Sequence, residues 1–372
     1  MPRQPRRPRR PRGSRKSLAL AVSAAALLLA GLQAGPASAR PAGEPATGKG
    51  CGGSTVGEVT LGTTRNTTTG RYELDDAGRG HHRTYDLGGS TTGNGTLFTD
   101  ADNDWCDGGR QTAGVAAHYI ASVVWDYYLN THGRRGVYGD GRGNCSRVHY
   151  GNHYSSAFWD ALSGCMTYGD GTDGSREPVL TIEAGAHEMT HAVTESTAGL
   201  GYSGEAGGLN EATSTIFAAA AEFSAHNPVD PGDYLTGERT DIMGTTARGW
   251  MDKPSRDGAS KDYWYPGIGT VDVHYSSGPA NHFFYLLAEG SGAKDVNGVH
   301  YDSPTYDGKP VRGIGLPAAE KIWYRALTVH MTSRTDYAAA RTATLRAAGE
   351  LYGTGSGQYA AVAAAWAAVN VK

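Results

Sequence analysis

The chain has 372 residues, of which 34 are Lys or Arg and 37 are Asp or Glu, and its formal net charge is −3. The first 39 residues hold eight of the basic side chains and no acidic one, so residues 40–372 carry a net charge of −11. An acidic body argues against a nucleic-acid-binding protein, which needs a basic face to displace counterions. A hydrophobic content of 39% argues against a disordered chain, and the length suits two domains that each bury a core.

Residues 1–39 have the pattern of a secretory signal peptide. A basic stretch ends at Lys16, an apolar run covers residues 18–32, and Ala37-Ser38-Ala39 is a small-residue cleavage pattern. A membrane anchor is the alternative, but the apolar run is too short for one and cleavage residues follow it. We therefore expect a secreted protein with no membrane contact after the signal is removed.

The four cysteines are expected to form disulfides, because an exported chain with an even number of them usually pairs them. Three pairings are possible among Cys51, Cys106, Cys145 and Cys165. We predict Cys51–Cys106 and Cys145–Cys165. The second bond would join residues 147–150 and 166–168 as an antiparallel pair of strands.

The pattern along the chain changes from strands to helices. Residues 40–50, made of Pro, Gly, Ala and polar residues, are interpreted as a short linker or pro-segment. From residue 51 to about 180, short runs such as 56–61 and 71–74 are bounded by Gly, Asn and Asp, which predicts strands and turns around one helix at 111–129. From residue 181 onward the spacing predicts helices at 182–197, 209–225, 280–287, 318–330, 336–352 and 359–369. The fold class is therefore α+β, with a β-rich part at 51–200 and a helical part at 201–372.

The strongest chemical signal is the motif His187-Glu188-Met189-Thr190-His191. Residues four apart lie on one face of a helix, so both imidazoles can bind one zinc ion. Glu188 lies at the edge of that face, where it can act as a general base. Two surface histidines beside a glutamate are the alternative, and the rest of the site argues against it.

A catalytic zinc also needs a third protein ligand and an open position. Glu211 follows a glycine-rich turn, with nineteen residues between it and His191, which is enough for a helix end, a loop and a return. A charge placed near a helix N-terminus is the alternative for Glu211 alone. The preceding motif favours the ligand.

These segments resemble the thermolysin-like family of secreted neutral zinc metalloproteases, the gluzincins. The similarity is carried by the metal helix 187–194, by Leu209-Asn210-Glu211-Ala212 and by the segment 273–281 around His274. It is also carried by Ala157-Phe158-Trp159 and by residues 166–171, which look like the family's substrate-edge strand and following turn. The resemblance implies a two-domain α+β fold with the zinc site in the cleft between the domains.

The resemblance also implies a role for each matching residue. His187, His191 and Glu211 would bind zinc, Glu188 would be the general base, and Tyr202 and His274 would stabilise the oxyanion. Ala157, Trp159 and Arg248 would bind substrate. The implied function is a secreted, monomeric zinc endopeptidase that cleaves proteins or peptides with a metal-activated water and prefers hydrophobic residues at P1′. An exopeptidase or processing protease on the same fold, and a non-catalytic zinc-binding relative, are the alternatives.

Several positions differ from the family pattern. An aspartate usual four residues after the third ligand is Thr215 here, and one usual five residues before the catalytic histidine is Gly269, for which Asp272 is a candidate substitute. Arg248 is shifted by one position. Ser156 replaces a substrate-binding asparagine, and Ala184 replaces a bulkier residue of the S1′ pocket.

The acidic excess suggests calcium, which prefers several oxygen ligands. Glu222 lies eleven residues after Glu211, about 20° past three helical turns, and Glu183 lies one turn before His187. With three acidic residues of the following loop they resemble the family's main calcium site: Glu183, Glu222, Asp230, Asp233 and Glu238. A second candidate has the spacing of another calcium loop of that family: Asp100, Asp102 and Asp104. Solvated acidic loops are the alternative for both.

Overall fold

The computed structural model describes residues 43–171, 180–237, 239 and 249–372. The predicted signal segment, Glu238 and Arg248 lie outside this described part. None of the described helices is both long and apolar enough to cross a membrane.

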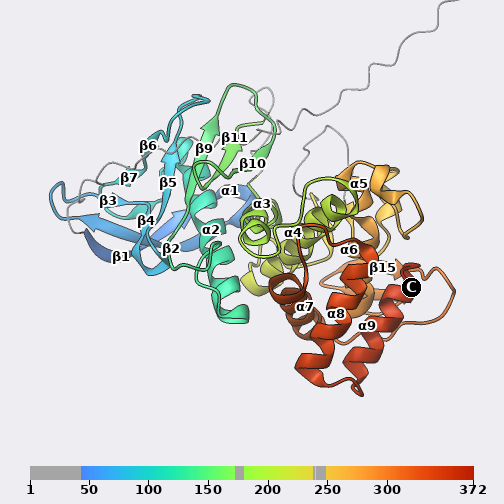
Figure 1. The fold of residues 1–372 in the computed structure, drawn as a ribbon. Coiled ribbons are helices and arrows are strands. Elements are labelled where there is room, and N and C mark those ends of the chain that lie inside the picture. The colour runs from blue at the N-terminus through green and yellow to red at the C-terminus, as the bar shows by residue number, and fades with distance from the viewer. Residues whose placement is uncertain (1–42, 172–179, 238, 240–248) are drawn as a thin grey trace, which may run out of the picture. The chain divides into compact units, whose positions relative to one another are not determined.

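The first sheet is built around a long antiparallel pair (Figure 1). β1 (Gly43–Cys51) pairs with β2 (Glu58–Asn66) along its whole length, from Gly43 opposite Asn66 to Cys51 opposite Glu58. The prediction of a linker at 40–50 is therefore wrong for residues 43–50. Their Gly and Pro content is unfavourable for a strand in isolation, but pairing with a neighbouring strand overrides such weak preferences. The strand order is β7-β3-β2-β1-β8, with β3 (Tyr72–Glu73), β7 (Thr99–Asp100) and β8 (Asp104–Trp105).

The second sheet has the order β10-β11-β9-β5-β4, with β6 paired to β5. β9 and β11 run parallel with Cys145 opposite Cys165, and both predicted disulfides, Cys51–Cys106 and Cys145–Cys165, are present. The predicted antiparallel pairing of these two strands is wrong, because β10 lies between them in sequence and itself runs antiparallel to β11. The strands are β4 (Asp75–Asp76), β5 (His82–Asp86), β6 (Thr96–Leu97), β9 (Cys145–Tyr150), β10 (Ala157–Asp160) and β11 (Cys165–Gly169).

Helix α2 (Arg110–His132) connects the sheets to the helical half of the chain. It contacts β2, β5 and β9 on one side and α3 (Ile182–Glu195) and α4 (Gly204–Ala225) on the other. Most of its residues from Ala113 to Tyr128 are buried, which is why one core cluster runs from the strands into the helices. Short helical segments precede it at α1 (Gly53–Val56) and at the 3-10 turn Ala77–Arg79.

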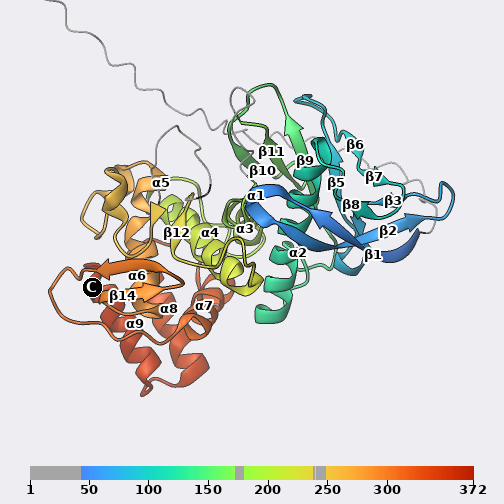
Figure 2. The same ribbon diagram turned by 180° about the vertical axis from the view of Figure 1, so that it is seen from behind.

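The helical half packs on α3 and α4 (Figures 1 and 2). α3 contacts β10 and β11, and α4 contacts α6 and α7, so these two helices join strands to helices. Stacked aromatic side chains such as Phe283 and Trp366, 3.8 Å apart between ring centroids, fill the core there. The helices are α5 (Val273–Ser276), α6 (Gly278–Ala288), α7 (Leu316–Arg325) with a π-helical turn at Ala326–His330, α8 (Tyr337–Tyr352) and α9 (Gly357–Ala368). Two short pairs, β12 (Leu235–Thr236) with β13 (Gly249–Trp250) and β14 (Gly292–Val296) with β15 (Val299–Ser303), and 3-10 turns at Pro254–Asp257 and Ile268–Thr270 complete it.

Helix α4 begins five residues before the predicted start at residue 209, in a glycine-rich turn that disfavours a helix on its own. A Cβ at Gly207 would lie 2.4 Å from the Val273 side chain, and one at Gly208 would lie 3.0 Å from the Ser276 carbonyl oxygen. The glycines therefore let α5 pack directly against the first turn of α4. This close packing brings the segment that carries His274 next to the helix that carries Glu211.

Candidate metal centre and active site

Helix α3 places His187 and His191 side by side. Its N-terminus is capped by the hydroxyl of Thr181, which accepts a hydrogen bond from the Ala184 N–H at 3.3 Å. The two imidazoles follow one turn apart, with ring centroids 5.1 Å from each other. They lie on the half-buried side of the helix, while the opposite side, with Met189 and Val193, is in the core.

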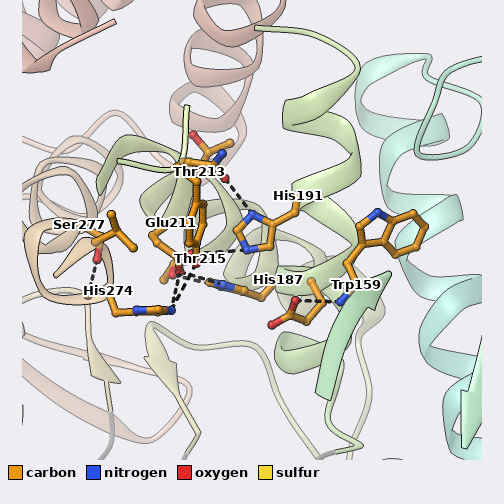
Figure 3. Close-up of polar contacts among 12 residues, drawn as sticks. Trp159, His187, His191, Glu211, Thr213, Thr215, His274 and Ser277 are labelled. Carbon is orange, nitrogen blue, oxygen red and sulfur yellow. Dashed lines mark hydrogen bonds and ion pairs between the residues drawn. The ribbon is translucent and has the colours of Figure 1, made fainter. Parts of the chain in front are cut away.

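The Glu211 carboxylate comes from α4 and meets both histidines (Figure 3). Its Oε2 lies 3.2 Å from Nε2 of His187, and its Oε1 lies 3.6 Å from Nε2 of His191. The Tyr202 hydroxyl also donates a hydrogen bond to Oε1. The carboxylate is buried, and three side chains from two segments, α3 and the loop before α4, converge on it.

The outer nitrogens of both histidines have partners that turn Nε2 toward the carboxylate. Nδ1 of His191 donates to Oδ1 of Asn210 at 2.8 Å, and the Asn210 amide in turn donates to the Leu200 carbonyl oxygen. Nδ1 of His187 lies 3.4 Å from the Thr215 hydroxyl. Sequence reasoning gave Asn210 no role, although its place directly before Glu211 was a usable signal.

The donor set fits one zinc ion. Nitrogen and oxygen ligands about 2.0–2.1 Å from a tetrahedral zinc lie roughly 3.3 Å from one another. The distances from Glu211 to the two imidazoles are close to that value, and one donor atom from each of the three residues lies within 4.8 Å of the others. The three predicted ligands are therefore brought together in a geometry that a zinc ion can use.

The surroundings of Glu211 keep its carboxylate charged. Burial alone would raise the pKa of Glu211, but hydrogen bonding and proximity to His187 and His191 hold that pKa well below its usual value. Burial would lower the pKa of His187, and the Glu211 carboxylate outweighs it and raises that pKa. Burial and the same carboxylate raise the pKa of Tyr202. The phenol therefore keeps its proton at neutral pH and can donate it in a hydrogen bond.

Glu188 lies between α3 and the edge strand β10. Its Oε2 accepts a hydrogen bond from the Trp159 N–H at 3.1 Å (Figure 3). That N–H therefore points away from β11 and toward the metal helix. Ala157 and Trp159, the predicted substrate-edge residues, are both partly exposed on this strand.

Tyr202 and His274 complete the group on the side of α5. The Tyr202 hydroxyl lies 3.4 Å from Nε2 of His274, and that nitrogen lies 3.8 Å from Oε2 of Glu211. Nδ1 of His274 donates to Oδ1 of Asp272 at 2.8 Å, and the same oxygen accepts the His274 N–H. Asp272 thus orients His274 from two residues away, while Gly269 lies in a tight turn where a Cβ would be 3.2 Å from the Glu205 nitrogen.

A second acidic cluster lies farther along the same two helices. Glu183 of α3, Glu222 of α4 and Asp230 of the following loop are buried, with carboxylate oxygens within 4.8 Å of one another. Arg239 forms an ion pair with Asp230. Asp233 is not in the group of three: its Oδ1 accepts the Leu235 N–H.

The aspartates at 100–104 are not gathered in this way. Oδ1 of Asp100 accepts the N–H groups of Asp102 and Asn103, and Oδ1 of Asp102 accepts the N–H of Asp104. Among the described residues the three carboxylates do not form a metal-binding group. They stabilise the turn between β7 and β8.

Comparisons with known proteins agree with this geometry. The model of the thermolysin metallopeptidase catalytic domain matches residues 47–195, and that of the thermolysin metallopeptidase alpha-helical domain matches residues 198–371. The chain is 59% identical over 319 residues to a transglutaminase-activating metalloprotease of Streptomyces mobaraensis, which covers 85% of this chain and 41% of that protein. It is 38% identical over 342 residues to a thermolysin of Alicyclobacillus acidocaldarius subsp. acidocaldarius, covering 88% of this chain and 59% of that protein.

A solved structure gives the same result for the fold. The precursor of protealysin, a metalloproteinase from Serratia proteamaculans, superimposes with a TM-score of 0.60 at 26% identity, covering 78% of this chain and 87% of that one. The chain spans about 40 to 60% of the length of the two sequence relatives above. The α+β fold with a β-rich first part and a helical second part is confirmed.

Proposed function

Because the chain belongs to the thermolysin family of metallopeptidases, we propose that it is a zinc-dependent endopeptidase. The observation that carries the proposal is the convergence of His187, His191 and Glu211, with Glu188 beside them on α3, where it accepts a hydrogen bond from the edge strand β10. Glu188, the proposed general base, is present, which favours an active endopeptidase over a non-catalytic zinc-binding relative. His187, His191 and Glu211 would hold the zinc.

When bound, zinc supplies Lewis-acid activation of a water molecule and of the substrate carbonyl. Glu188 is placed to accept a proton from the attacking water and to pass it to the leaving nitrogen. Tyr202 and His274 are placed to donate hydrogen bonds to the carbonyl oxygen as it gains negative charge. Donors preorganised in this way are worth a few kcal/mol each in the transition state.

The substrate would be an extended stretch of protein or peptide lying along β10. That strand is at the edge of its sheet, so its outward backbone groups can pair with a further strand, and the Trp159 N–H would exchange Glu188 for a substrate carbonyl oxygen. Ala157 and Trp159 would contribute these groups, Arg248 would bind the substrate backbone, and a hydrophobic residue would be favoured at P1′. The segment 1–39 would direct export, and the protein would act as a monomer without membrane contact. The boundary between its two catalytic subdomains would lie near residue 200.

The proposal is tested by comparing wild type with Glu188→Gln on casein. The variant keeps a side-chain oxygen for the Trp159 N–H but cannot accept a proton, so the rate should fall roughly 10²- to 10⁴-fold. Zinc content should stay at one ion per chain, because Glu188 is not a ligand. Removal of zinc with 1,10-phenanthroline should abolish the remaining wild-type activity, and equal activity of the two proteins would reject the proposal.

Quenched fluorescent peptides blocked at both ends separate an endopeptidase from an exopeptidase, which would leave them intact.

A processing protease is the second candidate, because one relative is named for activating a transglutaminase. A processing enzyme should cleave few sites in a folded precursor and digest casein poorly. Efficient casein digestion therefore favours the general endopeptidase.

We also propose a structural calcium ion between α3, α4 and the loop after α4. The carboxylates of Glu183, Glu222 and Asp230 are buried with oxygen atoms within 4.8 Å of one another, and burial raises the pKa of Asp230. Calcium is a hard divalent cation that prefers several oxygen ligands gathered in this way. Asp233 and Glu238 would complete the site from the loop.

A further inference from the structure

The turn between β10 and β11 presents a leucine to solvent. Leu162 is 94% exposed, whereas the other large hydrophobic residues counted as exposed in the described part lie between 38% and 54%. Single exposed apolar residues are common on protein surfaces and need no explanation by themselves. Two further features distinguish Leu162: its backbone is held firmly, and it lies next to the proposed active site.

The backbone of the turn is fixed by one aspartate. Oδ1 of Asp160 accepts the Leu162 N–H at 3.1 Å, and its Oδ2 accepts the Ser163 hydroxyl at 2.6 Å. Arg147 anchors the same carboxylate at 2.9 Å. The Asp160 carbonyl oxygen accepts the Gly164 N–H at 2.8 Å.

A covalent bond holds the base of the turn. Cys165, at the start of β11, is joined to Cys145 of β9. The Cys145 N–H also donates to the Gly164 carbonyl oxygen at 3.3 Å. Leu162 is therefore displayed by a turn that has little freedom to fold it away.

The turn continues the edge strand that faces the metal helix. The Trp159 N–H points to Glu188, so outward backbone groups occur at residue 159 and, with the period of two along a strand, at 157. Leu162 lies two residues past the end of β10, in the turn that leads into β11. A peptide that extends from the scissile bond along β10 would reach the turn.

Tyr138 lies close both to the Trp159 ring and to Gly164 of the turn. The Tyr138 ring lies 6.2 Å from the Trp159 ring, and its hydroxyl lies 3.9 Å from where a Cβ at Gly164 would be. Tyr138 is itself partly exposed. Aromatic side chains therefore extend from Trp159 toward the turn that presents Leu162.

We propose that Leu162 determines specificity by binding an apolar side chain of an extended substrate, about three residues from the one that faces Trp159, on the side toward which β10 runs. This inference rests on the proposed function, because the occupant is the polypeptide being cleaved. An apolar side chain on a fixed backbone gains contact area on binding without the cost of ordering a mobile loop. The preference should therefore appear in kcat/KM for long substrates and be absent for short ones.

The test uses peptides blocked at both ends. A short peptide has two residues on each side of the scissile bond, and extended peptides carry four more residues, either all Leu or all Ser, on one side or the other. For wild type, the Leu extension on one side only should raise kcat/KM about tenfold over the Ser extension, as expected for partial burial of a leucine. Leu162→Ala should remove that gain, Leu162→Asp should remove it as well, and neither should change the rate on the short peptide.

Leu351→Ala is the matched control, since Leu351 is an exposed leucine on α8 that should affect no substrate. Melting temperatures should be equal for all variants because both leucines are solvent-exposed. The inference is overturned if Leu162→Ala keeps the gain, if it slows short and long peptides alike, or if Leu162 proves by sedimentation to hold two copies together. Failure of wild type to cleave even the short peptide would overturn the proposed function and the inference with it.

Discussion

At the scale of single residues, Asp272 is the side chain on which the position of His274 depends. It accepts hydrogen bonds from the ring and from the backbone N–H of His274. Asp272→Asn can still cap α5, because asparagine is a good N-cap, but it loses the charge that holds the imidazole. We expect kcat to fall about tenfold or more with little change in KM, since the loss acts on a donor used in the transition state.

Asp295→Asn is the control for that variant, because Asp295 forms a similar pair with His300 at 2.7 Å on the exposed β14–β15 hairpin. Steady-state kinetics on a blocked peptide should show no effect of this second change. A normal kcat for Asp272→Asn would show that packing alone positions His274.

Thr215 is a weak partner for His187, a proposed zinc ligand. Its neutral hydroxyl lies 3.4 Å from Nδ1 of His187, whereas Asn210 holds His191 at 2.8 Å. Groups that orient zinc histidines typically change metal affinity 10- to 100-fold. Thr215→Asp should therefore lower the zinc dissociation constant about tenfold and Thr215→Val should raise it, as measured by competition with a chromogenic chelator. An unchanged constant in both variants would mean that the hydroxyl does not contribute.

Some residues of the proposed metal site could be predicted from the sequence more directly than others. His187, Glu188 and His191 lie within one helical turn, where spacing fixes geometry. Tyr202 and His274 were assigned only through the resemblance, because their approach depends on how α5 packs on the glycines of α4. Asp272 could be suspected because it is close to His274 in sequence.

At the scale of elements, strand direction was the feature that sequence did not determine. The disulfide between Cys145 and Cys165 constrains which residues are adjacent but is compatible with either direction of β9 and β11. The direction of β11 depends on β10, which lies at the outer edge of the sheet and pairs antiparallel with β11, so that β11 runs parallel to β9. Similarly, β1 was missed because its strand conformation is imposed by β2 across the sheet.

Helices α3 and α4 are expected to depend on calcium for their mutual stability. Glu183 and Glu222 bring one carboxylate from each helix to the cluster with Asp230. Adding millimolar calcium to calcium-free protein in a zinc-containing buffer should raise the melting temperature by several degrees, since saturation at 100 times Kd adds about 2.7 kcal/mol. Scanning calorimetry measures the shift.

Glu222→Gln should abolish this response to calcium. Asp102→Asn should keep it, because the 100–104 turn gathers no group of carboxylates. A response that is lost in Asp102→Asn and kept in Glu222→Gln would place the calcium ion in that turn instead.

At the scale of the whole molecule, residues 40–372 carry a strongly acidic net charge, but near neutral pH the change in stability with pH depends on buried histidines as well. Burial lowers the pKa of four of them, to about 3 for His82 and His132 and in the same direction for His118 and His282. Both ring nitrogens of His118 form hydrogen bonds, one with the Thr84 hydroxyl and one with the Gly62 carbonyl oxygen. These imidazoles therefore stay neutral in the folded protein under conditions in which an unfolded chain would protonate them.

Because these histidines bind protons more weakly in the folded protein than in the unfolded chain, acidification lowers the stability of the fold. Below a pKa of about 6.5 the unfolded chain binds more protons than the folded protein at these four positions, so stability falls as the pH falls from 7 toward 5. Each histidine contributes at most about 1.4 kcal/mol per pH unit. His149 acts in the opposite direction: burial would lower its pKa, but the hydrogen bond to Asp170 raises it, so its contribution is lost as the pH rises.

His132 offers the cleanest test of this balance. Its ring stacks on Tyr324 with centroids 4.0 Å apart, so His132→Phe keeps the stacking surface and removes the titrating group. Urea unfolding at pH 7.5, 6.5 and 5.5, with zinc and calcium held at saturating concentrations, should give a free energy that declines with acidification in both proteins. The decline between pH 6.5 and 5.5 should be smaller in the variant by about 1 kcal/mol, because unfolding takes up fewer protons without the histidine. Equal slopes would show that His132 is protonated in the folded protein as readily as in the unfolded chain.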